Sequence, residues 1–264
     1  MFSRLETAES VRVPVRATVA TTTAWGGGDP LDIVLERIAA NTDATRIELS
    51  IGARPVADPI EVLARWADRF QFQAHHSAPI GAGVHIRPTI SADPHAAVAA
   101  VVAAGCDRYS GHPPAQRDAT WEQMIGWALR WWEACSAAGV HWSVETMYVP
   151  RTRKEHETSG GYWLTTPAEV WEFCRIMVGY GWTDPLLIDV SHLHIGWHGG
   201  QWTEGDICEL LASAPASGAH VSMNDGRRDE HRPAGSDELA WRWLAPHADR
   251  FDWIVDEGKR HAGW

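Results

Sequence analysis

The feature that most constrains the fold is a regular alternation of strand-like and helix-like segments along most of the sequence. Each of the first seven strand-like runs is followed by a segment with helical periodicity. The eight strand-like runs are 16–22, 46–51, 70–75, 107–112, 141–147, 186–192, 219–224 and 252–257. Eight such units in 264 residues are typical of an α/β fold with a closed parallel sheet. We predict a (β/α)8 TIM barrel, with 1–264 as a single TIM-barrel domain.

The helix-like segments carry recognisable start signals. A Ser, Thr or Asp side chain can accept hydrogen bonds from the first free N–H groups of a helix, and a following Pro has no N–H to leave free. Such signals precede the predicted helices 31–40, 60–70, 95–104, 121–138, 168–180, 204–214 and 237–248. An open doubly wound sheet is the alternative, but no GxGxxG turn follows the first strand-like run.

Composition narrows the classes of function. The net charge of −11 argues against broad binding to a phosphate backbone, so nucleic acid is an unlikely partner and a small-molecule substrate is favoured. No apolar run approaches the roughly 20 residues that span a bilayer, so we expect no membrane association. The first 15 residues lack the apolar region of a secretory signal, and the four cysteines are widely spread. Both observations favour a cytoplasmic protein.

Histidine and carboxylate residues gather at the ends of the strand-like runs, where a barrel places its active site. Burying so many charges is costly unless they are paired or hold metal, and imidazole with carboxylate suits Zn²⁺, Mn²⁺ or Fe²⁺. We therefore predict a divalent metal site, and the residues leave open whether it holds one ion or two or three per chain. The candidate ligands are His75, His112, Glu145, Asp189, His192, His220, Asp229, His231 and Glu257.

Their order along the chain resembles that of the xylose isomerase-like TIM barrels, which include sugar isomerases and epimerases and endonuclease IV. The resemblance covers about 46–257. It rests on His75-His76-Ser77, His112-Pro113, Val144-Glu145-Thr146, Ile188-Asp189-Val190-Ser191-His192, Met223-Asn224-Asp225, Asp229-Glu230-His231 and Val255-Asp256-Glu257.

The two branches of this superfamily imply different metal sites. Resemblance to endonuclease IV implies one ion on His75 and His112, with Glu145 bridging to a second ion. Asp189 and Glu257 would hold that second ion. His192, Asp229 and His231 would then hold a third. Resemblance to the epimerases implies one ion on Glu145, Asp189, a histidine of the seventh strand and Glu257, with His192 contacting substrate.

The seventh strand departs from both patterns. Ser222 occupies the position of the expected metal histidine, two residues before Asn224-Asp225. His220 lies on the same strand face but about 6.6 Å deeper. Either His220 reaches up to the site, or Ser222 leaves a coordination position open for water or substrate.

Several residues near the strand ends are candidates for substrate contact. Trp25 and Trp197 fall in predicted loops after strands and could wall a pocket, and His194 lies close to the predicted ligands. Arg227 and Arg228 suggest an anionic group on the substrate. Glu48 could face the rim, or pair with Arg46 or Arg16 inside the barrel. Tryptophans on the predicted helix 121–138 pack the outer ring or form a surface for a possible homo-oligomer.

Three functions are compatible with these features. The first is a metal-dependent isomerase or epimerase of a small sugar-like hydroxy-carbonyl compound, with Glu145, Glu257 and His192 as catalytic residues. The second is a multinuclear phosphoester hydrolase resembling endonuclease IV, which retention of His75, His112, Asp229 and His231 favours. The third is a multinuclear iron enzyme that oxidises or modifies a peptide. We favour the first.

Overall fold

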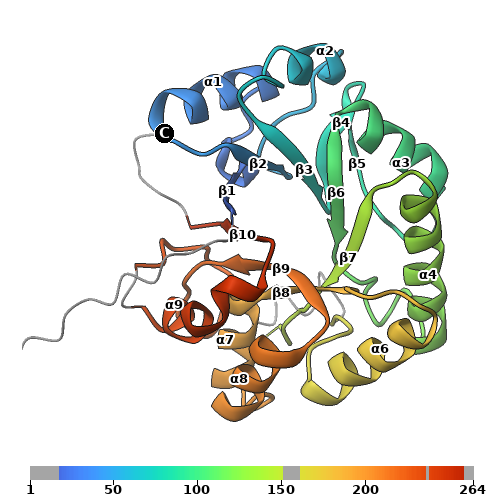
Figure 1. The fold of residues 1–264 in the computed structure, drawn as a ribbon, viewed down its shortest axis with the longest axis vertical. Helices are drawn as coiled ribbons and strands as arrows, with labels where there is room; N and C mark the ends of the chain where they lie inside the picture. The colour runs from blue at the N-terminus through green and yellow to red at the C-terminus, as the bar shows by residue number, and fades with distance from the viewer. Residues whose placement is uncertain (1–17, 151–160, 236–237, 259–264) are drawn as a thin grey trace, which may run out of the picture.

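Eight parallel strands close into a barrel (Figure 1). The computed structural model describes residues 18–150, 161–235 and 238–258. The strands follow one another around the barrel in the order β1-β10-β9-β8-β7-β6-β3-β2. They are β1 (Thr18–Thr22), β2 (Arg46–Leu49), β3 (Gln71–His75), β6 (Cys106–Gly111), β7 (His141–Glu145), β8 (Leu186–Asp189), β9 (Ala216–Val221) and β10 (Trp253–Asp256). The predicted α/β fold is confirmed as a (β/α)8 TIM barrel.

Helices surround the strands on the outside of the barrel (Figure 1). The α-helices are α1 (Leu31–Asn41), α2 (Pro59–Ala64), α3 (Pro94–Ala103), α4 (Trp121–Ala137), α6 (Pro167–Gly179), α7 (Val190–His198), α8 (Glu204–Ser213) and α9 (Leu239–Leu244). Two 3₁₀ helices, η1 (Thr23–Trp25) and η2 (Ala245–Arg250), follow β1 and α9. None of the described helices is both long enough and apolar enough to cross a membrane.

Most of the predicted helix starts are confirmed by the cap hydrogen bonds. The side chains of Asp58, Asp93 and Thr166 accept from backbone N–H groups of the helices that follow. Thr120 and Thr203 each form a reciprocal capping box. The cap predicted at Asp29 is wrong, because Asp29 instead accepts a hydrogen bond from Arg37 at 2.6 Å. The start predicted near Ser236 lies outside the described residues.

Several predicted boundaries need correction. The predicted helix 237–248 is α-helical as α9 only to Leu244 and continues as the 3₁₀ helix η2. The sixth strand ends at Asp189 rather than at residue 192, because Asp189 Oδ1 accepts from the backbone N–H groups of Ser191 and His192 and so begins α7. The next strand, β9, covers Ala216–Val221 rather than 219–224. α2 ends at Ala64 rather than at residue 70.

The hairpin of β4 (Ala78–Gly81) and β5 (Val84–Ile86) was not predicted. Its two strands pair with each other outside the barrel. The hairpin directly follows His75, His76 and Ser77, which line the cavity described below. It therefore forms part of the connection between a barrel strand and α3.

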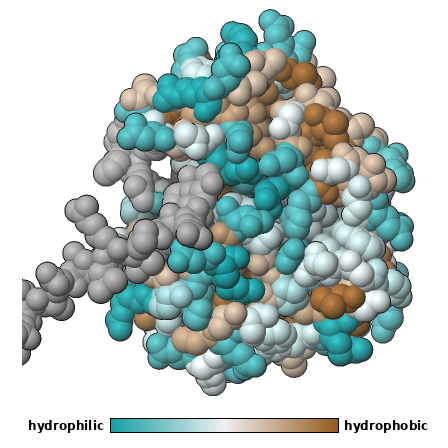
Figure 2. Space-filling model, viewed as in Figure 1, coloured by the Kyte–Doolittle hydropathy of each residue, from teal (hydrophilic) through white to brown (hydrophobic). Residues whose placement is uncertain are grey.

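Large aromatic side chains fill the space between α4 and the barrel. Trp127 and Trp131 of α4 are fully buried and pack against Trp142 of β7, with ring centroids 5.7 and 5.5 Å from its ring. Tyr109 of β6 completes this cluster. These tryptophans therefore belong to the outer layer of the barrel core. On the face shown in Figure 2, hydrophilic residues gather near the middle and hydrophobic residues form separate patches.

The amino-terminal ends of the strands carry paired polar groups. Arg46 donates to both carboxylate oxygens of Asp107, at 3.0 and 3.2 Å, and His141 hydrogen-bonds Ser217 at 3.0 Å. Next to Ser217, the ring of Trp253 covers Gly218 so closely that a Cβ there would lie 2.2 Å from it. This end of the barrel, which we call the barrel base, is closed by ion pairs and tight packing.

Candidate metal centre

The opposite end of the barrel holds a cavity of about 470 Å³, which is the size of a small-molecule site. We call this end the barrel mouth, because the carboxyl ends of the strands open into it. Eight of the nine predicted ligands line the cavity, all except His220. The lining residues are Ala24, Ser50, Ile51, His75, His76, Ser77, His112, Glu145, Asp189, His192, Asp229, His231 and Glu257.

Glu145, the last residue of β7, is the centre of the arrangement. Its Oε2 lies 2.8 Å from His112 Nε2 and 3.5 Å from His75 Nε2. Its Oε1 faces the other way and lies 3.3 Å from His220 Nδ1. Each oxygen of this buried carboxylate therefore belongs to a different group of imidazoles, as a carboxylate that bridges two ions would require.

His75, His112 and Glu145 form the first compact group. The two Nε2 atoms lie 3.2 Å apart, and ligands of a tetrahedral ion at about 2.1 Å are roughly 3.4 Å apart. The ring of His75 is oriented by Ser110, whose Oγ lies 2.9 Å from its Nδ1. The ring of His76 stacks on His112 at 4.0 Å. Burial lowers the pKa of His75, so its ring is neutral and able to ligate.

Asp189, His220 and Glu257 form the second compact group, which Glu145 joins through Oε1. His220 Nδ1 is 3.3 Å from Glu257 Oε2, so the deeper histidine reaches the site. Ser222 is also fully buried, yet its Oγ has no hydrogen-bond partner among the described residues. Of the two alternatives for this strand, the structure places His220 among the carboxylates.

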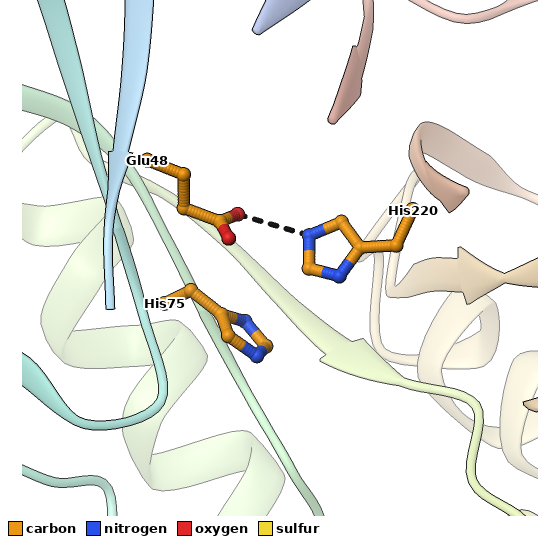
Figure 3. Close-up of side chains that lie close together, drawn as sticks. All are labelled: Glu48, His75 and His220. Carbon is orange, nitrogen blue, oxygen red and sulfur yellow. Dashed lines mark hydrogen bonds and ion pairs between the residues drawn. The ribbon is translucent and has the colours of Figure 1, made fainter. Parts of the chain in front are cut away.

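His220 is held from across the barrel interior by Glu48 of β2 (Figure 3). Its Nε2 lies 2.9 Å from Glu48 Oε2, and both side chains are fully buried. Burial opposes a charge on His220, but Glu257 and Glu48 outweigh it and raise its pKa well above the usual value. Glu48 therefore pairs with His220 rather than with Arg46, which bonds Asp107.

His192, Asp229 and His231 lie in a row and do not form one compact group. Asp229 Oδ2 lies between the two imidazoles, 3.5 Å from His192 Nε2 and 2.7 Å from His231 Nε2. His192 instead makes a compact group with Glu145 and Asp189. Its Nδ1 donates to the Thr146 carbonyl oxygen at 2.8 Å, which leaves Nε2 facing Asp229. The third ion stays a prediction.

The charges at the mouth are crowded and strongly coupled. Burial opposes a positive charge on His192, but Asp189 and Asp229 raise its pKa to about 10. Burial also opposes a charge on His231, and Asp229 and Glu257 raise its pKa to about 11. The pKa of Asp189 rises to about 6, mainly through burial. Positive imidazoles thus balance the carboxylates where no metal is bound.

The donor set fits a metal ion. Asp189 shows this best, because its Oδ1 accepts three hydrogen bonds while its buried Oδ2 has no hydrogen-bond partner among the described residues. An unsatisfied buried carboxylate oxygen is costly unless a cation meets it. Nitrogen and oxygen ligands in these numbers suit Zn²⁺, Mn²⁺ or Fe²⁺.

His194, Trp197, Arg227 and Arg228 are not among the described residues that line the cavity. His194 and Trp197 lie on α7, not in a loop, and His194 Nδ1 hydrogen-bonds Asn224 Oδ1 at 2.8 Å. Arg227 and Arg228 are exposed, and their backbone N–H groups bond Asp225. The side chain of Trp25 lies outside the described part of the chain. Substrate contact by these residues stays a prediction.

Sequence reasoning passed over two features of the site. The sequence leaves Glu48 open between the rim and the interior and gives no role to Gln73, which donates to Glu48 at 3.1 Å. The available signal is an isolated acid between Ile47 and Leu49 in a buried strand. The second feature is His76, whose ring stacks on His112 and lines the cavity.

Comparison with known proteins gives the fold. No protein-family model matches the chain, and no curated protein matches its sequence. Solved structures do match. A D-tagatose 3-epimerase-like protein is 12% identical, with a TM-score of 0.62 over 90% of this chain and 89% of that one. A xylose isomerase domain protein from Alicyclobacillus acidocaldarius is 12% identical, with a TM-score of 0.58 over 94% and 91%.

An AP endonuclease, family 2, from Brucella melitensis is 14% identical, with a TM-score of 0.59 over 93% of this chain and 94% of that one. These structures include both kinds of protein that the strand-end motifs resemble. The chain therefore has the fold of the xylose isomerase-like TIM barrels, as the motifs predicted.

Proposed function

We propose that this chain is a metal-dependent isomerase or epimerase of a small hydroxy-carbonyl compound. The observation that carries the proposal is the position of His220, with Nδ1 at 3.3 Å from both Glu145 and Glu257. In this position, His220 of β9 supplies the imidazole expected on the seventh strand of the barrel, although the sequence places it one layer deeper. Together with Asp189, these residues make a four-ligand set at the floor of a cavity of about 470 Å³.

The residues have distinct tasks in this reaction. A divalent ion on the four-ligand set would polarise the carbonyl and hydroxyl oxygens and acidify the neighbouring C–H bond. Glu145 and Glu257 are the carboxylates that move the proton. They come from β7 and the end of β10, two strands that are not neighbours, so each can face a different side of a bound substrate. His192, buried above Asp189, is placed to hydrogen-bond a substrate oxygen.

A second candidate is a hydrolase of small phosphoesters with two ions. The specific observation in its favour is the first group, since His75 and His112 lie 3.2 Å apart against Glu145 Oε2. A single ion on the four-ligand set does not need those two histidines. Two ions sharing Glu145 would activate water and stabilise the leaving oxygen.

Metal counting on the wild type and His112→Ala distinguishes the two. The isomerase proposal expects one tightly bound ion in both proteins, with turnover of ketose or aldose sugars retained in the variant. The hydrolase expects two ions, loss of one in His112→Ala, and turnover of a phosphoester panel that the variant loses. Iron in the wild type would direct the test to oxygen consumption. A chain that binds no divalent ion after reconstitution would contradict every metal-dependent function.

A further inference from the structure

A chain of buried polar side chains crosses the barrel interior beneath the metal centre. Arg46 Nη1 lies 3.5 Å from Gln73 Oε1, Gln73 Nε2 donates to Glu48 Oε2 at 3.1 Å, and Glu48 Oε2 lies 2.9 Å from His220 Nε2. Glu48 and His220 come from β2 and β9, which are separated in the barrel by two strands (Figure 3). The contact therefore runs across the interior and not along the sheet.

The chemistry of the groups fixes the direction of each hydrogen bond. Arg46 can only donate, so the oxygen of the Gln73 amide faces it and the amide nitrogen faces Glu48. The Glu48 carboxylate can only accept, so the proton of the last bond must sit on His220 Nε2. The lone pair of a neutral His220 is then on Nδ1, the nitrogen that faces Glu145 and Glu257.

We propose that Glu48, oriented by Gln73, is the positioning residue that makes Nδ1 of His220 the metal-binding nitrogen. The inference rests on the metal of the proposed function. Because Glu48, Gln73 and His220 are almost completely buried, water cannot replace the lost acceptor if Glu48 is removed. A carboxylate behind a metal-bound imidazole both orients the ring and increases its basicity. The deep position of His220 is thus supported by side chains of β2 and β3, from across the barrel interior.

A hydrophobic replacement and a conservative one separate positioning from direct ligation. Glu48→Leu removes the acceptor, and we expect its affinity for Zn²⁺ to fall about 10- to 100-fold in chelator competition. Glu48→Gln keeps an oxygen at the same place, and we expect it to bind within about fivefold of the wild type. If Glu48 were itself a ligand, with His75 and His220, the glutamine variant would lose as much affinity as the leucine variant.

A spectroscopic readout tests the tautomer itself. In the zinc-loaded wild type, nitrogen-15 NMR of the histidine rings should show an Nε2–H of His220 that exchanges slowly, identified by its absence in His220→Asn. We expect this signal to be retained in Glu48→Gln and lost in Glu48→Leu. Gln73→Met, which only removes the donor to Glu48, should weaken binding about threefold and serves if Glu48→Leu does not fold.

Ser217→Ala is the matched control. Ser217 lies on the same strand as His220, and its replacement removes a partly buried hydrogen bond to the imidazole of His141 at the barrel base. Its zinc affinity should equal that of the wild type. If Glu48→Leu also binds zinc as tightly as the wild type, the inference is overturned while the proposed function stands. If the wild type itself binds no divalent ion, the proposed function fails, and this inference fails with it.

Discussion

The barrel base and the barrel mouth both bury charged and polar side chains, but they do so in opposite ways. At the base, buried Arg46 donates two hydrogen bonds to Asp107, whose side chain is about half exposed. At the mouth, Glu145, Asp189 and Glu257 crowd together with imidazoles, and Asp189 Oδ2 has no hydrogen-bond partner within the described segments. The base is arranged to stabilise the fold, whereas the mouth is arranged to receive a cation. In barrels of this kind, chemistry belongs to the carboxyl ends of the strands.

The largest expected effect comes from Glu145 at the mouth. Glu145→Gln removes the charge that both compact groups share, so we expect bound metal to be lost and turnover to fall at least about 10³-fold, or roughly 4 kcal/mol. Metal content and initial rates measure this. Asp252→Asn, which loses an exposed ion pair at the base, is the control and should keep both. Equal losses in the two variants would remove the distinction between mouth and base.

A packing change at the base should have the opposite effect, with a large loss of stability and little loss of metal binding. Gly218→Ala places a Cβ 2.2 Å from the ring of Trp253, which cannot move away inside the closed barrel. We expect the free energy of unfolding to drop by about 2–3 kcal/mol in urea titration. Zinc affinity should fall far less than in Glu48→Leu, because the ring of Trp253 meets that of His220 only edge-on, at 6.0 Å between centroids. A variant as stable as the wild type would contradict the tight packing described here.

Asp189→Asn tests whether a metal ligand at the mouth lowers the stability of the metal-free protein. Burial, Glu145 and Glu257 oppose the charge of Asp189 more than His192 favours it, so its pKa rises to about 6. Asparagine keeps an oxygen to accept the bonds that begin α7. We expect the metal-free variant to be more stable than the metal-free wild type by about 1 kcal/mol at pH 7.

Added zinc should reverse that order. At a thousand times its dissociation constant, an ion stabilises the wild type by about 4 kcal/mol, and it should stabilise Asp189→Asn much less. Thermal unfolding with and without zinc compares the four states. A metal-free variant that is less stable than the wild type would show that the carboxylate supports the fold.

The smallest expected effect is a pH dependence at the base. Burial, aided by Arg108, lowers the pKa of His141 below 6.5 in the folded protein. The unfolded chain therefore binds this proton more readily, so stability is complete above about pH 6.5 and declines as the pH falls. His141→Gln should reduce the decline between pH 7 and pH 5 by less than about 1 kcal/mol, measured by urea midpoints. Identical slopes for the two proteins would contradict this assignment.

Much of the fold and the composition of the centre could be predicted from the sequence. Alternating periodicity predicted the eight barrel strands, and polar side chains at their ends predicted where the ligands gather. The reason is local, because a strand end is a property of a few neighbouring residues. The predicted site residues His75, His112 and Glu145 come together at the mouth for this reason. Their roles with metal and substrate stay predictions.

What the sequence left open depends on contacts between distant strands. Whether His220 reaches the site is decided by Glu145, Glu257 and Glu48, which come from three other places in the chain. Asp189 ends β8 only because its side chain caps the next helix. The apolar run continues past Asp189, so its pattern predicted a longer strand. How deep a side chain lies in the barrel, and which group each carboxylate oxygen contacts, are properties of the folded interior.

The loop that carries Asp229 and His231 is closed at its own base. Met223 and Arg232 exchange two backbone hydrogen bonds, at 2.8 and 2.7 Å, just beyond β9. The segment between them is held a second time by Asn224, which donates to the Ser191 carbonyl oxygen and lies 2.8 Å from His194 Nδ1. The closure entropy of such a loop changes slowly with its length. Beyond Asn224 it can be shortened, extended or exchanged without re-threading any strand. This loop is therefore the segment to replace when the site is redesigned, because a new loop would change the residues facing His192 and leave the four-ligand set in place.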